Sequence, residues 1–219
     1  KHLISADYFF EKKLPVYEVA RRISRGERYS AQVKVTIPEG FDTSLIAEVF
    51  AAKLPTFNKD KFILEAKILE GYLFPDTYFF FSADSEKEVI KSMRENFEKK
   101  LNPLRPQIIS SGRSEKEIII MASIIEGEAR GDDDRDVISG ILWKRLGINM
   151  PLQVDVAPET YKKTGLPKNP IGNPGLLSIK AAIRPEKSYY LYYLHDKDGN
   201  IHYAKNFEEH KINRQKYLK

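Results

Sequence analysis

The feature that most constrains the fold is an apolar run, Ile118 to Ile125, in which Ser123 is the only polar residue. Ser114 and Glu117 form a capping box in front of it, so the run predicts a helix that continues to about residue 129. A helix that is apolar all round lies inside its domain, because it has no face for water. It is also far shorter than the roughly 20 apolar residues that span a bilayer. The rest of the chain therefore has to surround this helix.

Capping signals and hydrophobic periodicity predict the surrounding elements. Ser85 with Glu88 repeats the capping box, and Asn206 with Glu209 predicts a cap for the last helix. Helices are expected over residues 16–25, 43–54, 59–69, 85–101, 135–146, 178–183 and 206–217. Strands are expected over residues 33–37, 190–194 and 201–204, the last two as a hairpin around an Asp-Gly turn. The predicted fold class is α+β, with more helix than strand and a long ordered loop over residues 149–176.

The first 54 residues predict a small module of two strand–helix units. Tyr8 to Phe10 is a short apolar stretch, and the helix after it ends at Gly26. The Pro38–Gly40 turn follows the second strand, and Thr43 is the expected cap of the second helix. Residues Leu14 to Leu54 are the expected core of this module.

Composition excludes several classes of site. The chain has no cysteine, so disulfides, thiolate metal sites and cysteine nucleophiles are excluded. The four histidines lack metal-ligand spacing, and the Asp132–Asp134 run lacks EF-hand spacing and instead predicts capping of the helix that starts at Arg135. The net charge is +5, but 36 basic residues are interleaved with 31 acidic ones. That pattern favours a mixed solvated surface over a nucleic-acid-binding module, and no metal or cofactor is expected.

Glu126 is the position most suggestive of chemistry. It follows directly on the apolar run, where partial desolvation would raise the pKa of a carboxyl and keep it protonated as a general acid. An ordinary glutamate at the wet end of a helix fits the pattern as well. Gln153 and Asp155 lie two apart in the following loop, so in an extended segment they point to one side, toward whatever Glu126 faces. Asn173 lies between Gly172 and Pro174, where it could equally satisfy local backbone groups.

Several blocks carry a resemblance to a known family. They occur in the family's order over essentially the whole chain and are, in this sequence, Ile37–Gly40, Glu70–Tyr78, Ala122–Ala129, Leu152–Asp155, Gly165–Pro167, Pro170–Gly175, Ser178–Ala182, Tyr190–Tyr192, Phe207 and His210. The nine-residue block Glu70–Tyr78 is highly specific. Together they resemble the endolytic murein transglycosylase family, also called the YceG-like family.

The resemblance implies a small LysM-like α/β subdomain in residues 1–56, including the N-terminal strand–helix unit, and a larger mixed α+β catalytic domain in residues 57–219. It implies a lytic transglycosylase that cuts peptidoglycan glycan strands between N-acetylmuramic acid and N-acetylglucosamine, without a cofactor. It also implies a single-pass membrane anchor before Lys1, a catalytic part on the extracytoplasmic face, and cell-wall synthesis proteins as partners.

The resemblance places the catalytic glutamate at Glu126 and makes five residues candidates for lining the glycan cleft: Glu70, Gln153, Asp155, Tyr161 and Asn173. The acid would protonate the glycosidic oxygen, and its carboxylate would then take the proton of the muramic 6-hydroxyl, which attacks C1 and closes a 1,6-anhydro ring. One carboxyl suffices because the substrate supplies the nucleophile, whereas ordinary glycosidases use two. Glu128, the rival carboxyl, lies about 200° around the helix from Glu126, so the two are not expected to face one cleft.

One departure from the family pattern concerns the segment after Asp155. Family members carry a longer segment before an Asn-Thr-Tyr block, whereas here Glu159-Thr160-Tyr161 follows almost at once. The shorter segment would change the border of the cleft and the preferred strand length. Two other functions fit the sequence: a non-catalytic peptidoglycan-binding wall protein, and a hydrolytic muramidase in which water attacks instead of the 6-hydroxyl.

Overall fold

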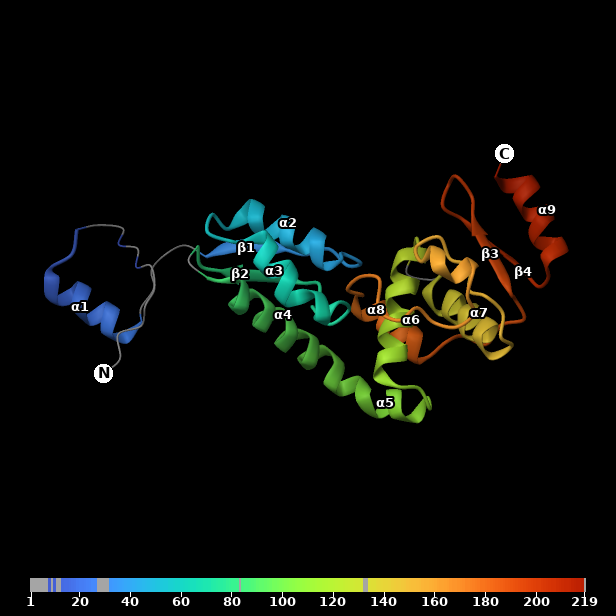
Figure 1. The fold of residues 1–219 in the computed structure, drawn as a ribbon, viewed down its shortest axis with the longest axis horizontal. Helices are drawn as coiled ribbons and strands as arrows, with labels where there is room; N and C mark the ends of the chain where they lie inside the picture. The colour runs from blue at the N-terminus through green and yellow to red at the C-terminus, as the bar shows by residue number, and fades with distance from the viewer. Residues whose placement is uncertain are drawn as a thin grey trace.

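The computed structural model describes residues 8, 10, 13–26, 32–82, 84–131 and 134–218. It has the predicted α+β class, with helices outnumbering strands and two small antiparallel sheets in the described ranges. Figure 1 shows an elongated molecule with a smaller lobe around β1 and β2 and a larger lobe around α6. No helix among the described residues is long and apolar enough to cross a membrane.

The smaller lobe is built around one pair of strands. β1 (Val33–Thr36) pairs antiparallel with β2 (Thr77–Phe80), and α2 (Thr43–Lys53), α3 (Lys59–Ala66) and the 3-10 turn η1 (Lys67–Leu69) connect them. Rings of Phe50, Phe57, Phe62 and Phe80 pack against one another at centroid distances of 5.3–6.3 Å. This aromatic cluster fills the space between the sheet and the helices.

The predicted domain boundary after residue 56 falls inside this packed unit. The partner of β1 is β2, and the lobe's apolar core continues through Phe62, Leu73 and Val89 to Met93. The smaller lobe is therefore longer than the sequence predicts, because its sheet is closed by a strand twenty residues beyond the expected boundary.

Helix α4 (Glu86–Leu101) connects the two lobes. Val89 and Met93 near its start belong to the smaller core, whereas Phe97 and Leu101 near its end belong to the larger one. It begins with the predicted Ser85–Glu88 capping box. The turn η2 (Asn102–Leu104) and α5 (Arg105–Ser110) then lead to the larger lobe.

The larger lobe surrounds α6 (Glu115–Glu128), as the sequence predicts. Residues 118–125 are all at most 3% exposed, and Ser123 satisfies its hydroxyl by donating to the Ile120 carbonyl at 2.8 Å. α7 (Arg135–Gly147), the turn η3 (Pro158–Tyr161) and α8 (Leu176–Ile183) follow, and α6 packs most extensively on α8. The predicted hairpin, β3 (Tyr192–His195) with β4 (Ile201–Ala204), and α9 (Phe207–Tyr217), capped by Asn206, complete it.

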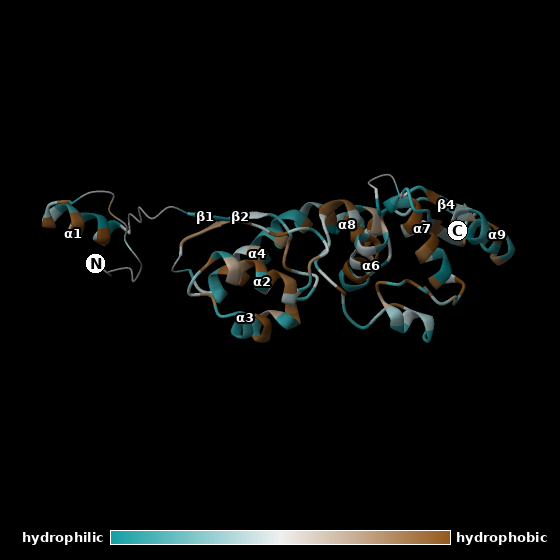
Figure 2. Cartoon of the chain, turned by 90° about the horizontal axis from the view of Figure 1, so that it is seen from above, coloured by the Kyte–Doolittle hydropathy of each residue, from teal (hydrophilic) through white to brown (hydrophobic). Residues whose placement is uncertain are grey.

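Two local predictions are wrong. α1 (Val16–Arg25) ends at Gly26 as expected, but it has no buried residue and Val16 is 85% exposed, so the expected core does not reach it. Figure 2 shows its apolar residues on a helix that lies apart from both lobes. Asp42, and not Thr43, caps α2, because its carboxylate accepts the Leu45 N–H at 2.8 Å.

The acidic run before α7 was predicted to cap that helix. Asp134 is the N-cap residue of α7, but its side chain makes no capping hydrogen bond and lies 3.4 Å from Nε2 of His195. Asp132 and Asp133 lie outside the described residues, as does the Phe9 position of the first expected strand.

Candidate active site

Helix α6 ends with two carboxylates that face different surroundings. Glu126 and Glu128 are two residues apart, which places them about 200° apart around an α-helix. Glu126 points to the junction between the lobes, and Glu128 points into a cavity of the larger lobe. The expectation that they do not share a cleft therefore agrees with the structure.

The Glu126 carboxylate is held by the protein on both of its oxygens. Oε1 accepts from Arg135 at 3.2 Å, and Oε2 accepts the backbone N–H of Gly175 at 2.8 Å. The Glu126 and Arg135 side chains are only 7% and 12% exposed, and Arg135 also donates to the Ser178 hydroxyl. Because Gly175 is the N-cap of α8, the carboxylate also lies where a helix favours negative charge. This is the environment of a paired anion.

Glu126 lies against the seam between the lobes, which we define as Gly40–Thr43, Glu70–Leu73 and Gly172–Gly175. Across it, Gly40 N–H donates to the Asn173 carbonyl at 2.8 Å, and Asn173 N–H donates to the Phe41 carbonyl at 3.0 Å. A Cβ at Gly172 would come within 2.4 Å of the Gly40 oxygen. The two lobes therefore meet backbone to backbone.

Glu70 and Asn173 lie together in the seam. Asn173 is 0% exposed; its Oδ1 accepts the Leu73 N–H at 2.9 Å, and its Nδ2 donates to Glu70 at 2.9 Å. The other oxygen of Glu70 accepts from the hydroxyl and N–H of Thr43 at 2.7 and 3.0 Å. Burial raises the pKa of the Glu70 carboxyl, and the hydrogen bonds from Thr43 oppose that rise. Of the predicted cleft residues, these two hold the lobes together and do not line the cavity described next.

The cavity measures about 780 Å³ and lies between the end of α6, the loop after α7, β3 and α9. That volume is within the range of ligand sites, roughly 300–1,000 Å³. Its lining includes Gln153, Asp155 and Tyr161, which the sequence predicted, together with Glu128. The structure thus brings three predicted residues together, with Glu128 in place of Glu126.

Glu128 is a partly buried carboxyl of the cavity. The Tyr193 hydroxyl donates to its Oε2 at 2.9 Å. Burial raises the pKa of Glu128 above its ordinary value, and the negative charge of Asp155 adds to the rise; hydrogen bonds from Tyr193 and the Val156 backbone lower it, but by less. A carboxyl in this state keeps its proton to higher pH and can serve as a general acid.

The loop after α7 presents two polar groups to the cavity. Thr160, 2% exposed, braces the loop: its hydroxyl donates to the Ala157 carbonyl at 2.7 Å and accepts the Val154 N–H at 3.1 Å. Gln153 has a positive φ of 50°, a conformation that costs energy for a non-glycine residue. The brace holds Gln153 in this conformation and keeps Asp155 at the rim.

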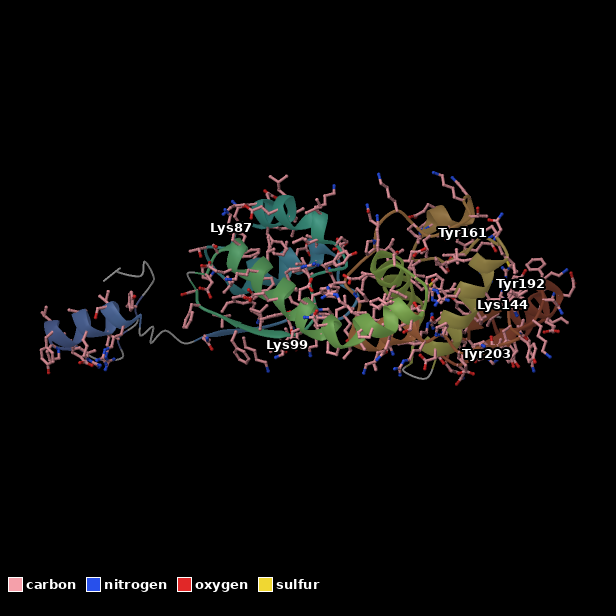
Figure 3. The ribbon with its side chains drawn as sticks, turned by 90° about the horizontal axis from the view of Figure 1, so that it is seen from below. Lys87, Lys99, Lys144, Tyr161, Tyr192 and Tyr203 are labelled. Atoms are coloured by element: carbon pink, nitrogen blue, oxygen red, sulfur yellow. The ribbon has the colours of Figure 1, made fainter. Side chains whose placement is uncertain are left out.

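Tyr161 completes this side of the cavity. Its hydroxyl donates to Asp155 Oδ1 at 2.6 Å, and that hydrogen bond is the main reason why the Tyr161 pKa rises to about 12. Figure 3 shows Tyr161 and Tyr192 on the larger lobe, from η3 and β3, away from Lys87 and Lys99 of α4. Tyr192, on β3, lines the same cavity.

The other residues of the cavity left little sign in the sequence. The sequence predicted Arg145 only as a favourable charge at the end of a helix. In the structure it is 5% exposed, donates to the Leu191 carbonyl at 2.6 Å and also donates to the Leu152 carbonyl. Tyr193 reads as an ordinary strand aromatic. Their roles depend on segments that lie dozens of residues apart. Among the described residues, no cluster of three or more His, Asp or Glu could hold a metal ion.

The sequence matches the YceG-like family over residues 1–158 and 159–216. The two matched parts meet between Pro158 and Glu159, close to the segment after Asp155 that is expected to be shorter than in the family pattern. The chain is 31% identical to the endolytic murein transglycosylase of Bacillus subtilis (strain 168) over 225 residues, covering 92% of this chain and 62% of the relative.

Two further relatives extend the comparison. The endolytic murein transglycosylase of Streptococcus pneumoniae serotype 2 (strain D39) is 28% identical over 270 residues, covering 94% of this chain and 49% of the relative. The crystal structure of a yceG-like protein from Listeria monocytogenes superposes with a TM-score of 0.75 at 29% identity, covering 90% of this chain and 80% of that one. The chain thus spans about half to three fifths of the curated relatives' length.

Proposed function

Because the chain belongs to the YceG-like family, we propose that it acts on peptidoglycan as an endolytic lytic transglycosylase, as its curated relatives are named. The observation that carries the proposal is the cavity of about 780 Å³ with one desolvated carboxyl, Glu128, and polar groups from Gln153, Asp155 and Tyr161 around it. A glycan strand needs such a polar, open site.

We propose Glu128 as the catalytic carboxyl, although the sequence predicted Glu126. Glu126 is bound to Arg135 and Gly175 and lies outside the cavity lining, so it is not placed to reach a substrate in the cavity. Glu128 lines the cavity, has a raised pKa, and has Tyr193 to orient it. These three features are those of a general acid–base group.

In the proposed reaction, protonated Glu128 donates its proton to the oxygen that links N-acetylmuramic acid to N-acetylglucosamine. The C1–O bond breaks, the leaving sugar keeps that proton as a hydroxyl, and positive charge develops at C1 of the muramic sugar. The Glu128 carboxylate then takes the proton of the 6-hydroxyl, whose oxygen bonds to C1. The product ends in 1,6-anhydromuramic acid, and Glu128 is protonated again.

A hydrolytic muramidase is the second candidate, favoured by a specific observation. Asp155 lines the same cavity and raises the pKa of Glu128 electrostatically, so two carboxyl groups are available, as in ordinary glycosidases. In that case Asp155 would activate the water that attacks C1. Alternatively, Asp155 would itself attack C1, and water would then hydrolyse the covalent intermediate. The chemistry at C1 separates the two functions.

Product analysis tests the proposal. Purified peptidoglycan is incubated with the protein, and soluble fragments are examined by mass spectrometry with and without borohydride reduction. Internal fragments with non-reducible 1,6-anhydro ends are expected. Fragments with reducible ends would assign hydrolysis instead, and intact strands that pellet with the protein would leave a wall-binding protein.

We also propose the cellular setting. Action on peptidoglycan would require the catalytic part on the extracytoplasmic side of the cell membrane, and a membrane anchor together with contacts to wall-synthesis proteins would keep it near new strands. Fractionation of the full-length protein, with protease accessibility from the outer face, checks this arrangement.

A further inference from the structure

The cavity carries more positive charge than the proposed chemistry at Glu128 uses. Three guanidinium groups line it, those of Arg130, Arg145 and Arg214, and none forms an ion pair with a carboxylate in the part of the chain that the structure describes. Arg145 is nearly buried and fixed by two backbone carbonyls, which satisfy hydrogen bonds but do not neutralise its charge. A buried cation without a counter-ion is costly unless a ligand supplies one.

The unpaired charge gathers at one end of the cavity. Arg145 lies over the Tyr192 ring at 5.0 Å from its centroid, and that ring stacks on His210 at 5.2 Å. Arg214 follows His210 by one turn on α9 and lines the same cavity. Burial lowers the pKa of His210, and the charges of Arg214 and Arg145 add to that effect. Nδ1 of His210 is buried and lacks a hydrogen-bond partner among the described residues. Arg145 also interacts electrostatically with Glu128. Arg145, His210 and Arg214 therefore form one basic end of the cavity that Glu128 also lines.

Resting on the proposed function, we propose that the Arg145–His210–Arg214 end of the cavity binds a carboxylate of the peptide that hangs from the lactyl group of muramic acid. The muramic sugar carries this peptide beside the bond that Glu128 would protonate, and the peptide has free carboxylates that match two guanidinium groups. Recognition of the peptide would then select which muramic residues along a strand are cut.

The test compares two substrates and a matched pair of variants. Glycan strands that retain their peptides are compared with strands stripped by an amidase, for the wild-type protein, Arg214→Gln and Lys216→Gln. Lys216→Gln removes the same charge from the same helix, but Lys216 does not line the cavity. Arg214→Gln is expected to raise KM for peptide-bearing strands about tenfold with kcat nearly unchanged. Lys216→Gln should match the wild type, and the two variants should differ little on stripped strands.

Equal KM values for the two variants on peptide-bearing strands would overturn the inference. So would a loss for Arg214→Gln that is as large on stripped strands. A binding experiment distinguishes a failure of this inference from a failure of the proposed function. A soluble disaccharide peptide and its form with amidated carboxylates are titrated into the protein. Amidation should weaken binding to the wild type several-fold and leave Arg214→Gln unaffected. If amidation changes nothing, the inference fails whether or not strands are cleaved.

Discussion

Glu126 and Glu128 have the same side chain on the same helical turn, and their surroundings set their chemistry apart. Glu126 accepts hydrogen bonds from a neighbouring guanidinium and from a helix N-terminus. Partial burial raises the pKa of Glu128, and the hydrogen bond from Tyr193 only partly offsets that rise. At the scale of the residue, desolvation and the hydrogen-bond donors around a carboxyl set its chemistry.

The Tyr193 hydroxyl should tune the pH profile. It donates to Glu128 and so lowers the pKa of that carboxyl. In Tyr193→Phe this support for the charged form is lost, so the pKa rises further and the fall of activity on the alkaline side moves to higher pH. Initial rates of fragment release against pH measure it. Tyr203→Phe, on β4 and outside the cavity lining, is the matched control. If the alkaline fall of activity stays at the same pH or moves to lower pH, the assignment of Glu128 as the general acid is contradicted.

Glu128 should also cost stability near neutral pH. Its folded-state pKa lies above the ordinary 4.5, so the folded chain holds this proton more tightly than the unfolded chain. That contribution to stability is complete below about pH 4.5 and is lost as pH rises through the folded pKa. Glu128→Gln should therefore raise the melting temperature at pH 7 relative to the wild type, with little difference at pH 4. A melting temperature that falls equally at both values would count against a strained, desolvated carboxylate.

The sequence could not tell which glutamate faces the cavity. The apolar run before them covers every face of α6, so it marks no side as the wet one. The side is chosen by Val156 and Tyr193, which lie about 30 and 65 residues farther along the chain, and by the seam on the other flank. Only the family resemblance predicted Tyr161 as a residue of the site.

At the scale of the element, the lobes meet through close backbone contacts that only glycine permits. A Cβ on Gly172 would lie 2.4 Å from the Gly40 carbonyl oxygen, and a backbone oxygen cannot rotate away. Gly172→Ala should lower the free energy of unfolding by about 1–3 kcal/mol, the usual cost of overpacking. Chemical denaturation monitored by circular dichroism measures it.

Gly147→Ala is the control for that prediction. Gly147 ends α7, and a Cβ added there would meet no other atom within 4 Å. Replacement by alanine in a helix gains up to about 1 kcal/mol. If both alanine variants unfold at the same denaturant concentration, the close contact in the seam does not exist in solution.

Local chemistry predicted where helices begin better than what they pack against. Both Ser/Glu capping boxes and the Asn206 cap are in place, because these hydrogen bonds lie within four residues. Asp42 took the place of Thr43 because a neighbouring residue offers the same acceptor one position earlier. The amphipathic pattern of residues 16–25 correctly predicted the helix α1. Periodicity does not show, however, whether another part of the chain packs on its apolar face.

At the scale of the whole molecule, Asn173 joins the lobes. Its buried amide bonds Leu73, Phe41 and Glu70 across the seam. Without it the Leu73 N–H and Glu70 Oε1 would lose these partners, whereas the Phe41 carbonyl would keep the Asn173 backbone N–H. Asn173→Ala should lower the free energy of unfolding by more than about 2 kcal/mol. Asn206→Ala, which removes only an exposed helix cap, should cost about 1 kcal/mol. Thermal or urea unfolding of the two variants compares them, and a smaller loss for Asn173→Ala would rule out this bridging role.

The division into a small first lobe and a larger second one could be predicted, but its boundary could not. β2 is a four-residue strand inside an aromatic-rich segment, and its pairing with β1 closes a loop of forty residues. No local signal records such a long-range pairing. The shared helix α4 then blurs any boundary, since it belongs to both cores.

Two isosteric variants, Glu128→Gln and Glu126→Gln, compared on purified peptidoglycan by mass spectrometry, would decide which carboxyl is catalytic. Glutamine at position 126 can still accept the Gly175 N–H, so the variant should fold, with a lower melting temperature, and still release fragments with 1,6-anhydro ends. Glu128→Gln should fold and release none. Fragments from Glu128→Gln, together with none from a folded Glu126→Gln, would contradict the assignment and return the catalytic role to Glu126.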